Sequence, residues 1–480
     1  MLDPLFDLVI RSDRVVTPAG VAACDVAIQG EKIAAVAAAG SFFDSNNAKR
    51  IIDATGKIVM PGGIDPHVHL KWYSPHPDGS VTYTDGPEIV GRAALHGGTT
   101  TMIDFVRWTH GKTIQQAIDD RHKDWTNNCH CDYGFHVMVE GALPPEIFGQ
   151  LAEVLRAGYP TVKLFTTDIT PSRRGRMVDF GDIWEVFKVV AQEHGLCVIH
   201  GEDNDIVMHM YDKVIRENRA GFENMAEVHN AMSEDLSFRR VLGLAKNVPG
   251  IALYFMHVSA AFGVEAIREA RAKGLPVYGE TLHQYLMYTS EDYKRPNGQI
   301  YHTYPSIKAQ ADQDALWAAT RDGTLHTIAT DEVCCSLKNK TLGKRVDDTT
   351  GGNVGVEPRV SLMYSEMVGR RGYPLEKFVD LVSGNAAKIM GLYPRKGALA
   401  VGADADITVL DPSRKFVLTK DMLHESDYSP WEGHEMLAWP CLTVLRGKVV
   451  VEDGKFLGDV KDGRFLPRKI AEPIRSGARL

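Results

Sequence analysis

Two histidines separated by one residue are the side chains whose spacing most directly suggests chemistry. They are His67 and His69, in the stretch Gly63-Ile-Asp-Pro-His67-Val-His69. In an extended strand, alternate side chains point to the same side, so both imidazoles can converge on one ion. Imidazole is the commonest neutral ligand for a transition metal. Taken alone, the pair fits two core or surface histidines equally well, so other residues must decide.

Four further side chains that can bind metal each lie within or at the end of an apolar, β-branched run. They are Lys163, His200, His257 and Asp331. Any one of them alone is explained by a core or loop position, and Lys163 by an aliphatic stem that extends to solvent. Four of the 18 histidines of the chain end such runs, together with one aspartate and one lysine. The coincidence of all six predicts a metal centre.

The lysine in this set points to two ions rather than one. A cationic amine would repel a metal, but a buried lysine can lose its charge. The neutral amine can then add CO₂ and form a carbamate, which is a carboxylate on a long arm and can bridge two ions. Two divalent ions about 3.5 to 4 Å apart hold a hydroxide between them and polarise a substrate carbonyl. Asp331, close to this bridging water, is placed to act as general base and acid.

A repeated strand and helix pattern must position these residues. Segments with helical periodicity separate eight apolar runs, which lie at 58–70, 99–105, 132–140, 161–166, 196–200, 251–257, 275–280 and 325–331. This alternation predicts an α/β fold, a (β/α)₈ TIM-like barrel, whose active site lies at the carboxyl ends of its strands.

Short β-rich runs with turn residues flank the barrel region at both ends of the chain. They occupy residues 7–60 and 404–454, and we interpret them as two parts of one small β-sandwich. The expected domains are 1–60 (sandwich, first part), 61–392 (metal-binding barrel), 393–454 (sandwich, second part) and 455–480 (C-terminal tail). The tail either packs at a subunit interface or is a frayed terminus.

Composition limits the partners and the compartment. The 480 residues carry a formal charge of -8, without a long basic run, which argues against nucleic acid or an anionic membrane as partner. No apolar run reaches the roughly 18 residues of a membrane span. The seven cysteines include no pair of CxxC units, and the N-terminus lacks the features of a signal peptide. We expect a cytoplasmic protein.

Several motifs together resemble the amidohydrolase superfamily, and within it the dihydropyrimidinase and hydantoinase branch. The resemblance extends from Asp7 to about Gly454, and besides the first histidine pair it is carried by Thr161-Val-Lys163, Val198-Ile-His200, His257-Val-Ser259, Gly279-Glu-Thr-Leu-His-Gln-Tyr-Leu286, Ala329-Thr-Asp331, Ser383-Gly-Asn-Ala-Ala-Lys-Ile-Met-Gly391 and Arg395-Lys-Gly397-Ala-Leu-Ala-Val-Gly-Ala-Asp-Ala-Asp406.

The resemblance implies a binuclear centre, usually zinc. One ion would be held by His67, His69 and Asp331, the other by His200 and His257, with carboxylated Lys163 between them. It also implies a homotetramer and a hydrolase of EC 3.5.2 type that opens a cyclic amide or imide to an N-carbamoyl amino acid.

Two departures from the family pattern concern the substrate. Family members usually carry a tyrosine five residues beyond the bridging lysine, as donor to the developing oxyanion, and this chain has Asp168 there. An ionised carboxylate cannot donate. Asp168 is therefore a candidate either for substrate binding or for a helix cap or loop acid. Tyr304 replaces a serine whose backbone contacts the ring in relatives, and is a second candidate contact.

Three other residues bear on the substrate. Asn385 keeps the family's second backbone contact to the ring, and Lys71 resembles the arginine that binds the substrate carboxylate in dihydroorotases. For Lys71 a solvated loop lysine is the alternative. Glu332 stands where relatives have a histidine after the catalytic aspartate. We therefore expect an acidic mouth that disfavours an anionic substrate.

Two alternatives stay open at this point. A dihydroorotase-like or allantoinase-like hydrolase would act on a different cyclic amide with the same ligands. A non-catalytic oligomeric scaffold would share the fold, but such relatives lose the ligands, and all six are present here.

Overall fold

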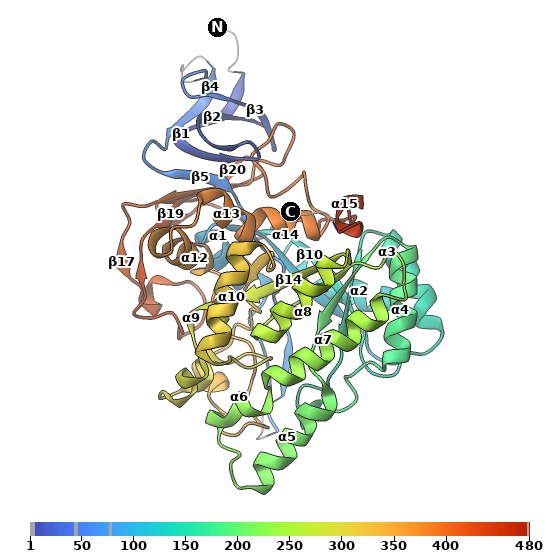
Figure 1. Cartoon of the computed structure of the whole chain (residues 1–480). Coiled ribbons are helices and arrows are strands. Elements are labelled where there is room, and N and C mark those ends of the chain that lie inside the picture. Colours follow the sequence, from blue (N-terminus) through green and yellow to red (C-terminus); the bar gives the residue numbers. More distant parts are fainter. Residues whose placement is uncertain (1–4, 43–46, 76–78, 478–479) are drawn as a thin grey trace.

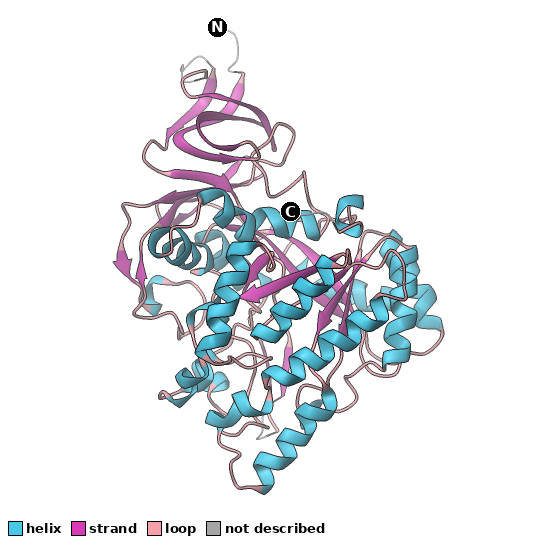
Figure 2. Ribbon diagram, in the orientation of Figure 1, coloured by secondary structure: helices cyan, strands magenta, loops and turns pink. Residues whose placement is uncertain are grey.

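A parallel barrel forms the body of the protein in the computed structural model, which describes residues 5–42, 47–75, 79–477 and 480 (Figures 1 and 2). Its eight strands follow one another around the sheet in the order β15-β14-β13-β12-β11-β10-β9-β6. They are β6 (Gly63–Asp65), β9 (Thr99–Arg107), β10 (Asp132–Met138), β11 (Thr161–Phe165), β12 (Leu196–His200), β13 (Leu253–Phe255), β14 (Val277–Leu282) and β15 (Thr327–Ala329). The predicted fold is confirmed: six of the eight strands lie inside their expected runs, and β9 and β14 each extend two residues beyond theirs.

Backbone pairing closes the barrel next to the first histidine pair. Val68 and Glu332 form a parallel bridge. The N–H of His69 donates to the carbonyl of Glu332 at 2.8 Å, and the N–H of Glu332 donates to the carbonyl of His67 at 3.3 Å. The first and last segments of the barrel are therefore joined where the expected ligands leave the sheet.

The longer helices pack around the outside of the barrel, as Figure 2 shows. They are α1 (Pro87–His96), α2 (Ile114–Trp125), α3 (Glu146–Arg156), α4 (Phe180–Gln192), α5 (Asn204–Arg216), α7 (Ala231–Ala245), α8 (Ala261–Ala272) and α10 (Gln310–Asp322). The start of α2 is fixed by a capping box, because the Thr113 side chain accepts from the N–H of Gln116 and the Gln116 side chain accepts from the N–H of Thr113. Shorter helices, α12 (Arg359–Tyr364), α13 (Leu375–Val379) and α14 (Asn385–Ile389), lead to the second domain.

Strands from both ends of the chain share the second sheet, which lies beside the barrel in Figure 1. They are β1 (Phe6–Thr17), β2 (Gly20–Gln29), β3 (Lys32–Ala38), β4 (Ala48–Asp53), β5 (Ile58–Pro61), β16 (Ile407–Asp411), β19 (Trp439–Leu445), β20 (Lys448–Glu452) and β21 (Lys455–Phe456). Apolar residues from both terminal segments, such as Ile10, Val26, Ile407 and Val444, form one core between its layers. The expected β-sandwich built from both termini is confirmed.

The predicted strand at 58–70 is wrong in one respect, because the structure divides it. Ile58–Pro61 belongs to the terminal sheet, and the barrel begins at Gly63. Gly62 marks the division, since a Cβ there would lie 2.2 Å from Oγ1 of Thr100. The backbone can approach β9 this closely only without a side chain.

A buried lysine ties the two domains together. Nζ of Lys396 lies 2.6 Å from Asp132 at the start of β10, and 3.0 and 2.5 Å from Asp404 and Asp406 just before β16. These contacts hold the terminal sheet at the amino ends of the barrel strands, away from the end where the ligands gather.

The C-terminal tail packs on the barrel of its own chain. The N–H of Leu466 donates to the carbonyl of Tyr133 at 2.8 Å, and Ile470 and Ile474 are buried. A frayed terminus is therefore wrong for this part of the tail. No helix in the described ranges combines the length and the hydrophobicity that crossing a bilayer requires.

Candidate metal centre

Three predicted ligands meet where the barrel closes. Nε2 of His67 and Nε2 of His69 each lie 3.1 Å from Oδ1 of Asp331. One possible ligand atom from each residue lies within 4.8 Å of the others. Two imidazoles and a carboxylate are donors that suit a divalent transition metal, so the donor set fits the expected ion.

His200 and His257 lie side by side next to this cluster. Their ring centroids are 4.5 Å apart, and the ring of His257 is 5.4 Å from that of His67. Burial lowers the pKa of His200 to about 4, and burial with the nearby cationic groups holds the pKa of His257 well below its usual range. Both rings are therefore neutral, which is the state that binds metal.

Lys163 reaches the same space from β11. Its side chain is buried, and Nζ lies 2.9 Å from Sδ of Met256 and 5.1 Å from the ring centroid of Phe165. Among the described residues no carboxylate lies within ion-pair distance of this amine. Burial lowers the pKa of Lys163 to about 7, so the neutral amine is accessible near neutral pH.

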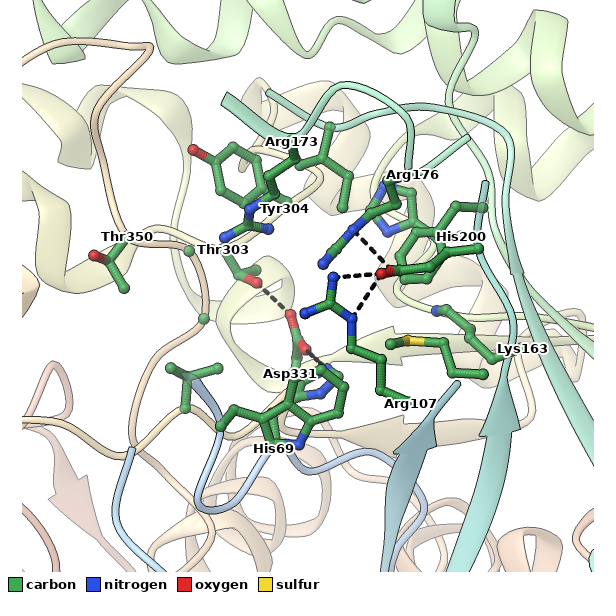
Figure 3. Close-up of a pocket in the computed structure, with 18 of the residues that line it drawn as sticks. His69, Arg107, Lys163, Arg173, Arg176, His200, Thr303, Tyr304, Asp331 and Thr350 are labelled. Atoms are coloured by element: carbon green, nitrogen blue, oxygen red, sulfur yellow. Dashed lines mark hydrogen bonds and ion pairs between the residues drawn. The ribbon is translucent and has the colours of Figure 1, made fainter. Parts of the chain in front are cut away.

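A cavity of about 390 Å³ opens above these six residues. Trp72, Phe165 and Tyr304 provide aromatic surface in its lining. Figure 3 shows His69, Lys163, His200 and Asp331 turned into this space. Lys163 and His200 lie on β11 and β12, whereas His69 and Asp331 follow the ends of β6 and β15. Its volume is that of a site for a small molecule.

Comparison with known proteins identifies the family. The model of the amidohydrolase family matches residues 58–450. The chain belongs to this family. The D-hydantoinase of Geobacillus stearothermophilus is 34% identical over 467 residues, which cover 96% of each chain. A D-phenylhydantoinase of Escherichia coli is 30% identical over 431 residues, which cover 87% of this chain and 89% of the relative.

Solved structures agree with the sequence comparison. The dihydropyrimidinase from Brevibacillus agri superposes with a TM-score of 0.90 at 32% identity, covering 97% of this chain and 99% of that one. The L-hydantoinase from Arthrobacter aurescens gives a TM-score of 0.85 at 27% identity, over 96% of this chain and 100% of the other. This amidohydrolase lies on the hydantoinase branch.

Buried residues that the sequence did not point to hold the predicted ligands of this amidohydrolase in place. Oε1 of Glu280 lies 2.7 Å from Nδ1 of His67 and accepts from the N–H of His257 at 3.1 Å. The Tyr254 hydroxyl donates to Oε2 of Glu280 at 2.8 Å. Glu280 is the last residue of the seventh predicted run, and this position at a strand end could have marked it as a residue of the site.

A second carboxylate orients the ring of His200. Nε2 of His200 lies 3.0 Å from Oε2 of Glu202, so Nδ1 is the nitrogen left for a metal. Oε1 of Glu202 lies 2.8 Å from Nδ1 of His229, whose Nε2 is 2.8 Å from the Tyr211 hydroxyl. Such outer partners fix the tautomer and the direction of a ligating histidine. Glu202 follows the fifth run by two residues and had no motif to mark it.

Two of the predicted ligands adopt left-handed backbone conformations. The φ angles of His257 and Asp331 are 39° and 53°. Non-glycine residues adopt this region rarely, and such strain gathers at functional sites because the surrounding contacts hold it in place. Thr303 supplies one of these contacts, since its hydroxyl donates to Oδ2 of Asp331.

Of the four predicted substrate contacts, only Tyr304 lines the cavity. Nζ of Lys71 pairs with Asp124 at 2.7 Å, so the structure does not support a carboxylate clamp there. The Asn385 side chain donates to the carbonyl of His326 at 3.0 Å, outside the cavity lining. Asp168 also lies outside the lining, and its Oδ1 accepts from the N–H groups of residues 175, 176 and 177. The loop-acid interpretation of Asp168 agrees with this position.

The expected acidic mouth is wrong. Glu332 is buried outside the cavity lining, where its Oε2 accepts from the N–H groups of Gly355 and Val356 at 2.8 and 2.9 Å. The lining instead contains four arginines, namely Arg107, Arg173, Arg174 and Arg176.

Proposed function

We propose that this amidohydrolase opens the ring of a cyclic amide or imide by hydrolysis of a C–N bond, as a hydantoinase or dihydropyrimidinase does. One observation carries the proposal, the convergence of His67, His69 and Asp331 with His200, His257 and Lys163 at the base of one cavity. Relatives named D-hydantoinase, which match 96% of the chain, support the reaction class.

The ligand arrangement supports two divalent ions, with zinc as our proposal for the metal. His67, His69 and Asp331 would hold one ion and His200 and His257 the other. Lys163, converted to a carbamate by CO₂, would bridge them, and its burial, which lowers the pKa of the amine to about 7, supports this modification. When bound, such a pair of ions activates water and polarises the substrate carbonyl.

Asp331 would move the proton between water and the leaving nitrogen. Its Oδ1 faces both histidines of the first pair, and its Oδ2 accepts from Thr303. Those contacts hold the carboxylate in one orientation at the base of the cavity, within reach of a bound ring. Tyr304 would form part of the wall against which the ring packs.

The assembly and compartment are separate proposals. We propose a homotetramer in the cytoplasm. Exposed large apolar side chains on neighbouring helices, Met232 and Leu236 on α7 and Phe262 on α8, support a subunit interface. Light scattering would then give about 212 kDa, four times the 53.0 kDa of one chain. A mass near 53 kDa would refute the tetramer.

Metal removal and substrate profiling test the function. Protein stripped with a chelator should lose hydrolysis of hydantoins and dihydropyrimidines, and zinc should restore it. His67→Ala should stay inactive after the same reconstitution. Full activity without metal would refute the mechanism, and hydrolysis of dihydroorotate or allantoin alone would favour the alternative cyclic amides. Absence of both bound metal and hydrolysis after growth with zinc would favour the non-catalytic scaffold.

A further inference from the structure

Four guanidinium groups line the side of the cavity above the ligands, and we call Arg107, Arg173, Arg174 and Arg176 the arginine wall. Arg107 ends β9, and the other three belong to the loop that follows β11. Figure 3 shows Arg107, Arg173 and Arg176 turned toward the space above Lys163 and Asp331. Two separate segments of the chain therefore direct positive charge to one place.

The carboxylates in the lining do not balance this charge. Asp331 and Glu140 are the two acids among the described lining residues, and Asp331 belongs to the ligand set. Glu140 is shared, because Nε of Arg107 donates to its Oε1 at 2.6 Å and Nε of Arg176 lies 3.2 Å from its Oε2. In the described part of the chain, no acid lies within 4.0 Å of Arg173 or Arg174. Four cations against one carboxylate leave three positive charges (4 - 1 = 3) in the wall.

The wall is crowded as well as charged. Burial, and then repulsion from Arg173, lower the pKa of Arg176 to about 9. The guanidinium of Arg173 lies 5.7 Å from the ring centroid of Tyr304. Like charges gathered in a partly desolvated space repel one another, and an anion placed among them relieves that repulsion.

Asp168 builds the loop that presents three of the four arginines. Its Oδ1 accepts N–H groups from Gly175, Arg176 and Met177 at 3.0, 2.9 and 2.8 Å. The N–H of Gly141 donates to the carbonyl of Arg176 at 2.9 Å, which ties the loop to the segment after β10. A loop fixed in this way receives a ligand with little ordering cost.

We propose that the natural substrate is a cyclic amide whose ring carries a carboxylate substituent, and that the arginine wall binds this carboxylate while the ring amide lies over the ligands. The planar guanidinium forks match a carboxylate in shape and charge. Lys71 is not available for this role, because its amine already pairs with Asp124 outside the cavity lining. The inference rests on the proposed function, since the ring amide must be the reacting group.

Paired substrates that differ only in charge test the inference. With the metal-loaded enzyme, we compare 5-(2-carboxyethyl)hydantoin and 5-carboxymethylhydantoin with their primary amides. For at least one arm length, kcat/KM for the acid should exceed that for the amide by about tenfold or more, as expected for charge-assisted hydrogen bonds. Equal or higher kcat/KM for both amides would overturn the inference and leave the proposed function intact.

Variants of the wall separate its effect from general damage. Arg173→Gln and Arg174→Gln should each lower kcat/KM for the acid by about fivefold to tenfold more than for the amide. Arg173→Glu should reverse the preference. Arg268→Gln is the matched control, because Arg268 is half-exposed on α8 and pairs with Asp322. Equal losses on acid and amide would show that the arginines only support the loop or bind the carboxylate that ring opening releases.

Binding measurements keep the two proposals distinguishable. If the metal-loaded enzyme hydrolyses neither acid nor amide, nor any hydantoin or dihydropyrimidine, the proposed function fails. Calorimetry then compares the acid and the amide as ligands. Tighter binding of the acid that weakens in Arg173→Gln and at high salt would support the carboxylate site on its own. Equal binding of both would overturn it.

Discussion

Glu280 and His67 form a buried pair, with Oε1 of the acid 2.7 Å from Nδ1 of the ring. This contact leaves Nε2 of His67 directed at Asp331. The same oxygen accepts from the N–H of His257, so one carboxylate positions a ligand of each expected ion. Burial opposes protonation of His67, but Glu280 and Asp331 outweigh it and raise its pKa to about 9. The field that favours a proton on this ring also favours a metal cation.

Replacing Glu280 should weaken metal binding. Glu280→Gln removes the charge that orients and polarises His67, and loss of such an outer partner lowers metal affinity by about 10-fold to 100-fold. Competition with a chromogenic chelator measures the affinity. Tyr254→Phe is the matched control, because it removes a neutral donor to Glu280 and leaves the carboxylate, so its effect should be smaller. Unchanged affinity in Glu280→Gln would contradict this assignment.

Removal of the Thr303 hydroxyl should affect turnover more than metal content. The Thr303 hydroxyl donates a hydrogen bond to Oδ2 of Asp331 and holds the carboxylate in its orientation. Thr303→Val keeps the shape of the side chain and removes the bond, and a loss of about 1 to 2 kcal/mol corresponds to about a 5-fold to 30-fold lower kcat. Metal per chain should stay as in the parent, and Thr303→Ser should recover most of the activity. If Thr303→Val turns over at the parental rate, the hydroxyl does not position Asp331.

Lys163 should make metal uptake dependent on pH and CO₂. Burial lowers the pKa of Lys163 to about 7, so the neutral amine that adds CO₂ predominates above that pH and declines below it. Reconstitution with zinc and bicarbonate should therefore be more complete at about pH 8 than at about pH 6. Lys163→Ala should lose the bridged metal, and a short carboxylic acid should restore part of the activity. Metal uptake by Lys163→Ala equal to that of the parent would argue against the bridge.

Asp168 should control the order of the loop at 168–177. Asp168→Ala removes an acceptor of three N–H groups, whereas Asp168→Asn keeps one oxygen in place. We expect faster amide hydrogen exchange across this loop in the alanine variant, and KM raised by about tenfold or more, with a smaller change in the asparagine variant. Unchanged exchange would mean that other contacts hold the loop.

A buried acid far along the sequence should give the fold a pH dependence. Burial, and then repulsion from Glu357, raise the pKa of Glu425 well above its usual range. The pKa of Glu425 is higher in the folded than in the unfolded state. Its contribution to the free energy of unfolding is therefore present at low pH and is lost as the pH rises through the folded-state pKa. Glu425→Gln should avoid this loss, so its Tm should gain about 1 to 3 °C on the parent between about pH 6 and pH 9.

An exposed acid is the control for this measurement. The Glu291 side chain is 73% exposed, and Glu291→Gln should show no such pH-dependent gain over the parent. If Glu425→Gln and the parent lose stability in parallel as the pH rises, Glu425 is not the group responsible.

The convergence of the six candidate ligands on one cavity could be predicted from sequence, because the position of each follows from a local pattern. A strand places its last residues at a known edge of the barrel, so His200 and His257 needed only a correct count of strands. The predicted place of Glu332 at the cavity mouth is wrong because adjacent residues of an extended segment face opposite sides. The side chain of Glu332, next to the candidate ligand Asp331, is directed at the N–H groups of Gly355 and Val356.

The arginine wall could not be predicted in the same way. Arg173-Arg174-Gly-Arg176 reads as a solvated basic stretch, since nothing in its own spacing fixes a direction. Its direction comes from three N–H groups converging on Asp168 and from the tie to Gly141, which are contacts of the folded loop. The same contacts give Asp168 a structural role at the position where the family pattern predicts a tyrosine.

The bridge between the first and last segments of the barrel also determines when the site can form during synthesis. His67 and Asp331 are 264 residues apart (331 - 67 = 264), and the bridge between Val68 and Glu332 brings them together. A ribosome-bound chain that has not yet released its eighth strand can gather histidines but lacks the carboxylate beside them. Acquisition of the proposed metal complement would therefore be a late maturation step, and it would report that the whole barrel has been completed.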